Sequence, residues 1–296
     1  MNTPPGPQSM MEPALGEAAT FVERTLDALL PTPSGPEARL LEAMRYAAMN
    51  GGHRLRAFLV LQTGRLFGVD RRALGRAAAA VECVQAYAMA HDALPARDAD
   101  AAADGKTSLH SAFDEPTAIL AGDALLAFAF GLLASSDAIG DPFVRTELVT
   151  RLAQAAGHSG MIGGQMLETA FANAAGGGTP PLPEISRLQR MKTAALITFC
   201  CEAGAILGRA SPPARHALSA YGQDVGLAFR IAADLAAADG KSADTRRPTV
   251  VSAMGAERAH AQAMALSAQA VRHLDLFDEK ADLLRAAAEF VVARRG

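Results

Sequence analysis

Apolar residues recur along this chain at intervals of three and four positions, and turn-forming residues separate the segments that show this period. That spacing is typical of helices with one buried face. An additional apolar helix is expected after Arg56, and the clearest interior loops are 175–181 and 239–248. The remaining predicted helices are 11–30, 37–49, 71–91, 116–135, 142–156, 158–174, 182–208, 212–239 and 255–295. The pattern therefore predicts one domain of about ten helices.

Composition supports the same fold class. Half of the 296 residues are hydrophobic, tryptophan is absent and tyrosine occurs three times. Alanine dominates the hydrophobic residues and is the best helix former, whereas strand-favouring aromatic residues are scarce. We expect an all-α protein with a single domain over 11–296. The prolines of segment 1–10 predict a disordered lead-in.

Charge and cysteine content restrict the partners and the compartment. The formal net charge is −3 and the isoelectric point is near 6.2, so overall electrostatics favour neither nucleic acid nor an anionic membrane. Three cysteines suggest no disulfide framework, and we expect a cytoplasmic protein. No signal peptide is evident, and the strongly apolar run 124–134 is too short for a membrane span.

Four aspartates follow an apolar helix in the middle of the chain: Asp92, Asp98, Asp100 and Asp104. Carboxylate oxygens are the ligands that Mg²⁺ prefers, and the ion keeps its waters for a substrate phosphate. A helix break near Pro95 would allow Asp98 to fold back toward Asp92. The same stretch is also typical of a solvated acidic loop, so the spacing alone leaves both interpretations open.

Eight ordered blocks resemble the trans-isoprenyl diphosphate synthases, most closely bacterial farnesyl diphosphate synthases. They read G-G-H-R-L-R, A-A-A-V-E-C-V-Q-A-Y, H-D-A-L-P-A-R-D, G-K-T-S-L-H, A-I-L-A-G-D-A-L-L, G-G-Q-M-L-E, R-M-K-T-A-A-L-I and V-G-L-A-F-R-I-A-A-D-L. The resemblance implies an isoprenoid-synthase-type helical bundle around a deep apolar cavity, usually as a homodimer. It also implies condensation of isopentenyl diphosphate with an allylic diphosphate held by Mg²⁺ on two aspartate-rich motifs.

The resemblance also assigns candidate site residues. Asp92 and Asp98 match the metal-binding carboxylates of the first motif, and Lys192 and Thr193 match the catalytic pair at the allylic diphosphate. An aromatic ring at the position of Tyr87 floors the cavity and favours products of about fifteen carbons. The substrate-binding positions are His53, Arg54, Arg56, Gln85, Gln165, Lys241 and Tyr87.

Several charged positions of the family pattern are replaced. The second motif, D-D-x-x-D in the family, keeps only Asp234. In the family, two arginines after the first motif contact the diphosphates; in this chain Ala103 and Asp104 stand at their positions. The second aspartate of the first motif is replaced by Ala93. Losing the two arginines and weakening the lysine contact at His53 would cost diphosphate binding roughly 4–8 kcal/mol, at about 1.5–3 kcal/mol per charged hydrogen bond. Three further family residues are also replaced: His53 stands in place of a lysine, Gln85 in place of a histidine and Arg230 in place of a glutamine.

Three functional hypotheses follow. The first is a prenyltransferase of reduced activity that binds prenyl diphosphates. The second is an inactive homologue that binds a prenyl chain or modulates an active synthase as the partner subunit of a heteromer. The third is ionisation and cyclisation of a single prenyl diphosphate, which the loss of the second motif disfavours.

Overall fold

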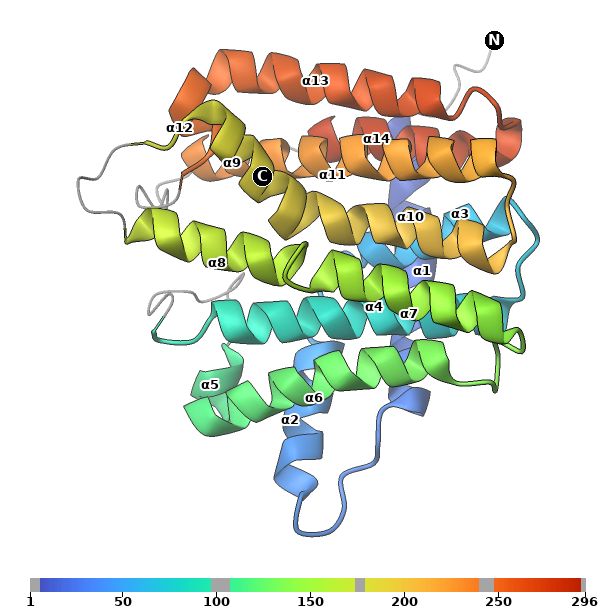
Figure 1. Ribbon diagram of the computed structural model, residues 1–296, viewed down its shortest axis with the longest axis vertical. Coiled ribbons are helices and arrows are strands. Elements are labelled where there is room, and N and C mark those ends of the chain that lie inside the picture. The colour runs from blue at the N-terminus through green and yellow to red at the C-terminus, as the bar shows by residue number, and fades with distance from the viewer. Residues whose placement is uncertain (1–5, 97–106, 174–178, 240–247, 294–296) are drawn as a thin grey trace. The chain divides into compact units, whose positions relative to one another are not determined.

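The computed structural model describes residues 6–96, 107–173, 179–239 and 248–293, and all regular elements in these ranges are helical (Figure 1). The all-α prediction is therefore confirmed. The α-helices are α1 (Pro7–Leu29), α2 (Ala38–Met49), α3 (Leu55–Arg65), α4 (Arg71–Asp92), α5 (Leu109–Ala112), α6 (Glu115–Ala134), α7 (Pro142–Ala156), α8 (Met161–Ala172), α9 (Leu182–Gln189), α10 (Ala195–Leu207), α11 (Pro212–Asp239), α12 (Val250–Met254), α13 (Ala256–His273) and α14 (Asp282–Ala293). A π-helix, η2 (Arg190–Ala194), and a 3₁₀-helix, η3 (Glu279–Ala281), complete the described elements.

Two predicted segments differ from the structure at the ends of the chain. Helix α1 begins at Pro7, so the lead-in predicted through residue 10 is helical over its last residues. The long C-terminal helix is interrupted between α13 and α14. There, Arg285 donates hydrogen bonds to the carbonyls of Leu274, Phe277 and Asp278 and so ties α14 to the turn that follows α13.

The chain divides into two compact units, which are described separately. The C-terminal unit contains Met1–Ala14, Gln62–Val69 and Thr150–Gly296, and the N-terminal unit contains Leu15–Leu61 and Asp70–Val149. Helices α1, α3 and α7 each contribute residues to both units.

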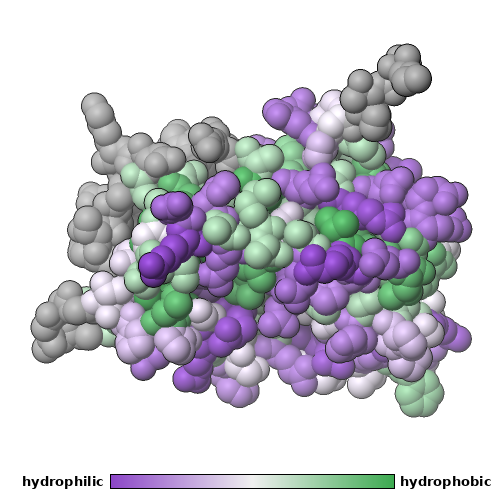
Figure 2. Space-filling model, turned by 90° about the horizontal axis from the view of Figure 1, so that it is seen from above, coloured by the Kyte–Doolittle hydropathy of each residue, from purple (hydrophilic) through white to green (hydrophobic). Residues whose placement is uncertain are grey.

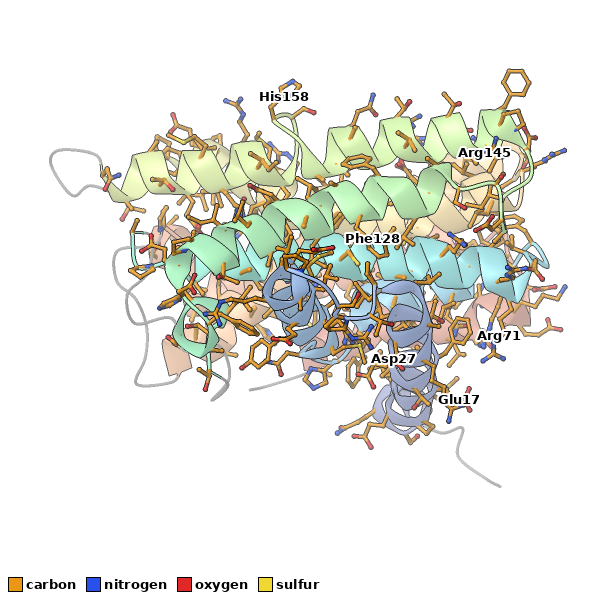
Figure 3. The ribbon with its side chains drawn as sticks, turned by 90° about the horizontal axis from the view of Figure 1, so that it is seen from below. Glu17, Asp27, Arg71, Phe128, Arg145 and His158 are labelled. Atoms are coloured by element: carbon orange, nitrogen blue, oxygen red, sulfur yellow. The ribbon has the colours of Figure 1, made fainter. Side chains whose placement is uncertain are left out.

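Helix α4 is the core of the N-terminal unit and packs against α6 and α2. Its small residues, including fully buried Ala77 and Ala80, allow close packing against neighbouring helices. Asp70 caps α4 and Asp114 caps α6, each accepting backbone N–H groups of the first turn. Asp27 of α1, labelled in Figure 3, forms an ion pair with Arg45 of α2.

Helix α6 is longer than the apolar run predicted from the sequence. The helix has 20 residues and is, by length and composition only, long and apolar enough to cross a membrane. Phe128, labelled in Figure 3, belongs to it. Of the most apolar window, 39% is buried inside the protein. A core helix of a soluble protein meets the same criteria, and α6 packs against α4 and α2.

Helix α11 is the centre of the C-terminal unit and packs against α10, η2, α13 and α14. A buried apolar cluster contains Ile185, Ile231 and Val250. Inside the unit, the Tyr221 hydroxyl donates to the Leu284 carbonyl at 2.7 Å and joins α11 to α14. Helix α13 lies at the top of Figure 1, and the view from that side in Figure 2 shows mostly hydrophilic side chains with scattered apolar ones.

Candidate active site

A π-helical turn carries the two residues to which the family resemblance gives a catalytic role. Lys192 and Thr193 lie in η2, between α9 and α10, where one predicted helix over 182–208 is interrupted. Single π-helical turns inside α-helices occur frequently at functional sites. The preceding helix α8 approaches this turn at Gly164, where a Cβ atom would lie 2.5 Å from the Lys192 backbone nitrogen. Glycine at this position therefore allows α8 to pack directly against the turn.

Lys192 is held in place by Glu168 of α8. The Lys192 Nζ atom lies 2.5 Å from Glu168 Oε2, and the two side chains are 12% and 10% exposed. An ion pair with this little solvent contact fixes both side chains, because either charge alone would be poorly solvated. The ammonium group is thus fixed within the C-terminal unit.

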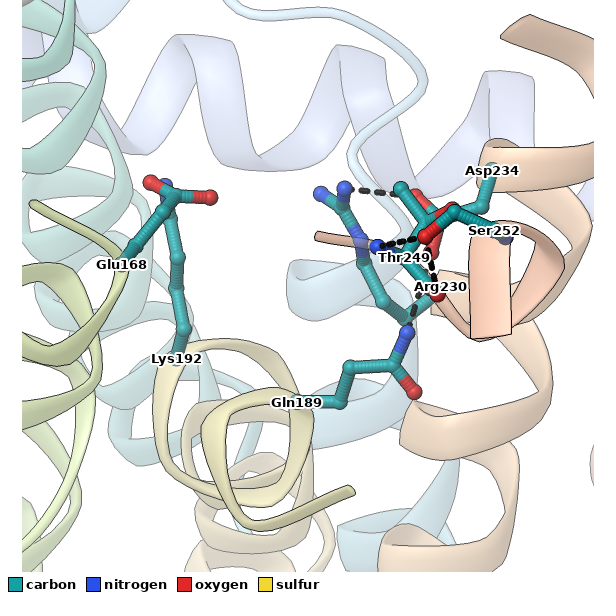
Figure 4. A network of polar contacts seen from close by, with 7 residues as sticks. All are labelled: Glu168, Gln189, Lys192, Arg230, Asp234, Thr249 and Ser252. Carbon is teal, nitrogen blue, oxygen red and sulfur yellow. Dashed lines mark hydrogen bonds and ion pairs between the residues drawn. The ribbon is translucent and has the colours of Figure 1, made fainter. Parts of the chain in front are cut away.

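Asp234, the surviving carboxylate of the second motif, is bonded on both oxygens. Arg230, one helical turn earlier on α11, donates to Oδ1 at 2.5 Å, and Gln189 Nε2 donates to Oδ2 at 2.9 Å (Figure 4). Burial raises the pKa of Asp234 above its usual value, while the Arg230 guanidinium acts in the opposite direction. Its side chain is only 3% exposed.

These contacts decide whether the residues of the C-terminal unit fit a divalent cation. A Mg²⁺ site needs carboxylate oxygens that are open to the ion and to water. In this network each carboxylate already has a cationic partner: Lys192 beside Glu168, and Arg230 beside Asp234. Within the described ranges, no three His, Cys, Asp or Glu side chains are grouped as a metal site. The donor set of this unit therefore does not fit the metal that the resemblance implies at the second motif.

The first motif begins at the end of α4 in the N-terminal unit. Asp92 is the last residue of that helix and is half-buried, and Asp98 lies outside the described residues. The predicted helix end before Pro95 is thus confirmed. The replaced position, Ala93, borders a small hollow of about 90 Å³ that Met89 also lines. Helix α4 therefore ends where the first motif begins.

Tyr87 is buried one turn before the end of α4. Its ring lies edge-on to His91, with centroids 4.8 Å apart, and only 6% of the residue is exposed. The His91 ring nitrogen lies 3.1 Å from the Ile119 carbonyl of α6. These contacts hold the aromatic ring rigidly within the N-terminal unit.

Arg54 is placed in a buried ion pair instead of on an open surface. Its Nη1 atom lies 2.8 Å from Glu82 Oε2, and Nη2 donates to the Ala48 carbonyl at 2.9 Å. Its φ of 54° is in the left-handed region, which is uncommon for residues other than glycine. Gly51 leaves the space that the guanidinium fills, since a Cβ atom there would lie 2.0 Å from Nη1. The described contacts thus give Arg54 a structural role.

The other predicted substrate-binding residues are distributed over both units. His53 is exposed beside the buried Arg54, while Arg56 and Gln85 are half-buried, all in the N-terminal unit. Gln165 of α8 is 4% exposed, and Lys241 lies outside the described residues.

Sequence reasoning missed three residues that bind predicted site residues within the two units. These are Glu82, Glu168 and Gln189, the partners of Arg54, Lys192 and Asp234. A signal was available for two of them, because Glu82 and Glu168 stand inside the blocks A-A-A-V-E-C-V-Q-A-Y and G-G-Q-M-L-E. Gln189 directly precedes R-M-K-T-A-A-L-I and carried no such signal.

Comparison with known proteins decides the family. The sequence pattern of the polyprenyl synthetase family matches residues 37–251, which is most of the chain. The chain belongs to the polyprenyl synthetase family. It is 36% identical to a farnesyl diphosphate synthase of Haemophilus influenzae over 95% of this chain and 97% of that protein. It is also 36% identical to the Escherichia coli farnesyl diphosphate synthase over 86% of this chain and 89% of that one.

Solved structures agree with this assignment. The crystal structure of an FPP/GFPP synthase from Zymomonas mobilis shares 44% identity with a TM-score of 0.88, covering 95% of this chain and 98% of that one. By sequence and fold, this chain is similar to prenyltransferases of the farnesyl and geranylgeranyl diphosphate synthase type.

Proposed function

We propose that this protein binds prenyl diphosphates and condenses isopentenyl diphosphate with an allylic diphosphate, slowly, to a product of about fifteen carbons. Family membership supports the reaction class. The rigid placement of Lys192 on the π-helical turn supports retention of an anion-binding group. Tyr87, buried on α4, supports the proposed product length.

The observation that supports reduced activity is the pairing of Asp234 with Arg230 and Gln189. Diphosphate departs from carbon only when the developing negative charge is neutralised. A buried carboxylate whose charge is already neutralised by a guanidinium attracts a metal ion for that step less strongly than an unpaired one. The leaving-group step is therefore the one we expect to be slow.

Other features of the proposal concern metal, assembly and location. Asp92 and Asp98 are the residues that would hold Mg²⁺ at the first motif, where the ion would neutralise diphosphate charge. We also propose that the protein is cytoplasmic and forms a homodimer. Exposed apolar side chains in the N-terminal unit support an interface: Ile119, Leu120 and Phe143 are 38%, 59% and 84% exposed.

The second candidate function is a non-catalytic partner subunit of an active synthase. The same exposed apolar side chains are compatible with it, because they fit a heteromer as well as a homodimer. Size measurement of the purified protein, alone and mixed with a canonical farnesyl diphosphate synthase, separates these assemblies. A complex only in the mixture favours the partner role.

Restoring the family charges tests the enzyme proposal. The variant combines Ala93→Asp, Ala103→Arg, Asp104→Arg, Ala233→Asp and Ala237→Asp. The assay supplies geranyl diphosphate, isopentenyl diphosphate and Mg²⁺ and measures the product by chromatography. We expect slow fifteen-carbon product from the natural sequence and a rate at least about tenfold higher after restoration, since about 1.4 kcal/mol of transition-state stabilisation suffices for that factor.

The control places one new carboxylate on an exposed surface outside the family motifs. Ala261→Asp changes an exposed alanine of α13 and should leave the rate unaltered. Absence of product from both the natural and the restored protein would refute the enzyme proposal and favour the partner role.

A further inference from the structure

Arg230 occupies the second motif as a cation that is part of the chain. Its guanidinium donates to Asp234 at 2.5 Å, and its side chain is 27% exposed, so it contacts solvent as well as the buried carboxylate. A guanidinium carries five N–H donors in a planar fork, and the contact with Asp234 uses one of them. The outward donors can therefore bind an oxyanion while the inner one remains on Asp234.

This arrangement has the same order of charges as a metal bridge. In a metal site a carboxylate binds a cation, and the cation binds the substrate phosphate. Here the carboxylate of Asp234 binds a guanidinium, whose planar donor geometry matches phosphate oxygens. Gln189, on the other oxygen of Asp234, prevents that carboxylate from turning outward toward an ion.

We propose that Arg230 replaces the divalent cation of the second motif, so that this face of the C-terminal unit binds a diphosphate group without metal. The inference rests on the proposed function, because the ligand is the diphosphate of the same substrates. Asp234 is then a positioning residue that directs the guanidinium, instead of a metal ligand. Lys192, similarly fixed by Glu168, supplies a second cation in the same unit.

Titration calorimetry of the full-length protein tests this proposal. The ligands are geranyl diphosphate and inorganic pyrophosphate, each measured with Mg²⁺ and with EDTA. We expect binding of both ligands to persist in EDTA. Under those conditions, Arg230→Gln, which restores the neutral family residue, should raise the Kd about tenfold or more, as expected for one lost charge-assisted hydrogen bond.

Two further variants separate a bridging cation from a structural role. Asp234→Asn keeps an oxygen acceptor for Arg230 but removes one negative charge, so it should lower the Kd in EDTA. A metal ligand would show the opposite, a loss of Mg²⁺-dependent binding. The matched control is Arg187→Gln, an exposed arginine on α9 of the same unit, which should leave the Kd unchanged.

The outcomes distinguish this inference from the proposed function. Binding only in the presence of Mg²⁺ would overturn the role of Arg230 and leave prenyl diphosphate binding intact. Equal Kd values for the natural protein and Arg230→Gln in EDTA would overturn it as well. Failure of both ligands to bind in either buffer would overturn the proposed function itself.

Discussion

The buried pair of Arg54 and Glu82 gives the sharpest stability prediction. Their side chains are 1% and 6% exposed, and Glu82 also accepts the Ala57 backbone N–H at 3.1 Å. Arg54→Met leaves the Glu82 carboxylate buried without its cation, which should cost about 3–5 kcal/mol of unfolding free energy. Glu82→Leu should cost less, because Glu23 Oε1 lies 3.6 Å from Arg54 Nε and still compensates part of the guanidinium charge.

The double variant Arg54→Met with Glu82→Leu removes both charges together. The backbone groups that had bonded to them lose partners, at about 1–3 kcal/mol, and Glu23, whose side chain is 42% exposed, loses its ion pair with Arg54 to solvent. Since the sum of the single changes is much larger, the double-mutant cycle should give a coupling energy of about 3 kcal/mol. Urea unfolding followed by far-UV circular dichroism measures each term.

A surface pair provides the control for this cycle. Arg39 and Asp114 are 2.6 Å apart, but their side chains are 58% and 44% exposed. Arg39→Met should therefore cost about 0–1 kcal/mol. A double variant as destabilised as the sum of its single variants would refute the view that Arg54 and Glu82 act as one buried unit.

Three further predictions use other described contacts. Gly164→Ala would force α8 away from the Lys192 turn and should lower the free energy of unfolding by about 1–3 kcal/mol. Gly131→Ala on α6, which has open space around it, should be neutral or stabilising, and the midpoints of urea unfolding compare the two variants. Burial raises the pKa of Cys83 to about 12, and all three thiols are buried, so a thiol reagent should label none in the native protein and three after denaturation. Hydrogen bonds from Thr117 and Arg39 lower the pKa of Asp114 to about 2. Because the unfolded carboxyl binds its proton near pH 4, the stability that Asp114 contributes should be present above that pH and be lost as pH falls toward 2; an Asp114→Asn control should lack this pH-dependent difference.

The sequence determined the helical class because an apolar period of three to four residues and a high alanine content favour helices and disfavour strands. It also predicted the bounds of α7 and α11 as they are observed, and a proline marks the start of each of these helices. The ordered blocks predicted the family and named Lys192 and Asp234 as positions of interest. These features depend on local sequence, so no tertiary contact was needed to recognise them.

Only the tertiary structure decided what the charged residues do. From the sequence, Arg54 was a substrate-binding candidate, Asp234 a surviving motif carboxylate and Arg230 a substitution. Folding places Glu82 against Arg54, which lies 28 positions away, and places Gln189 and Arg230 on the two oxygens of Asp234. A charge acquires its role from the partner that burial gives it, and two of these partners, Glu82 and Gln189, are distant along the chain. The spacing of residues in the sequence therefore indicated where the site lies, while the fold determined which of its charges are already satisfied.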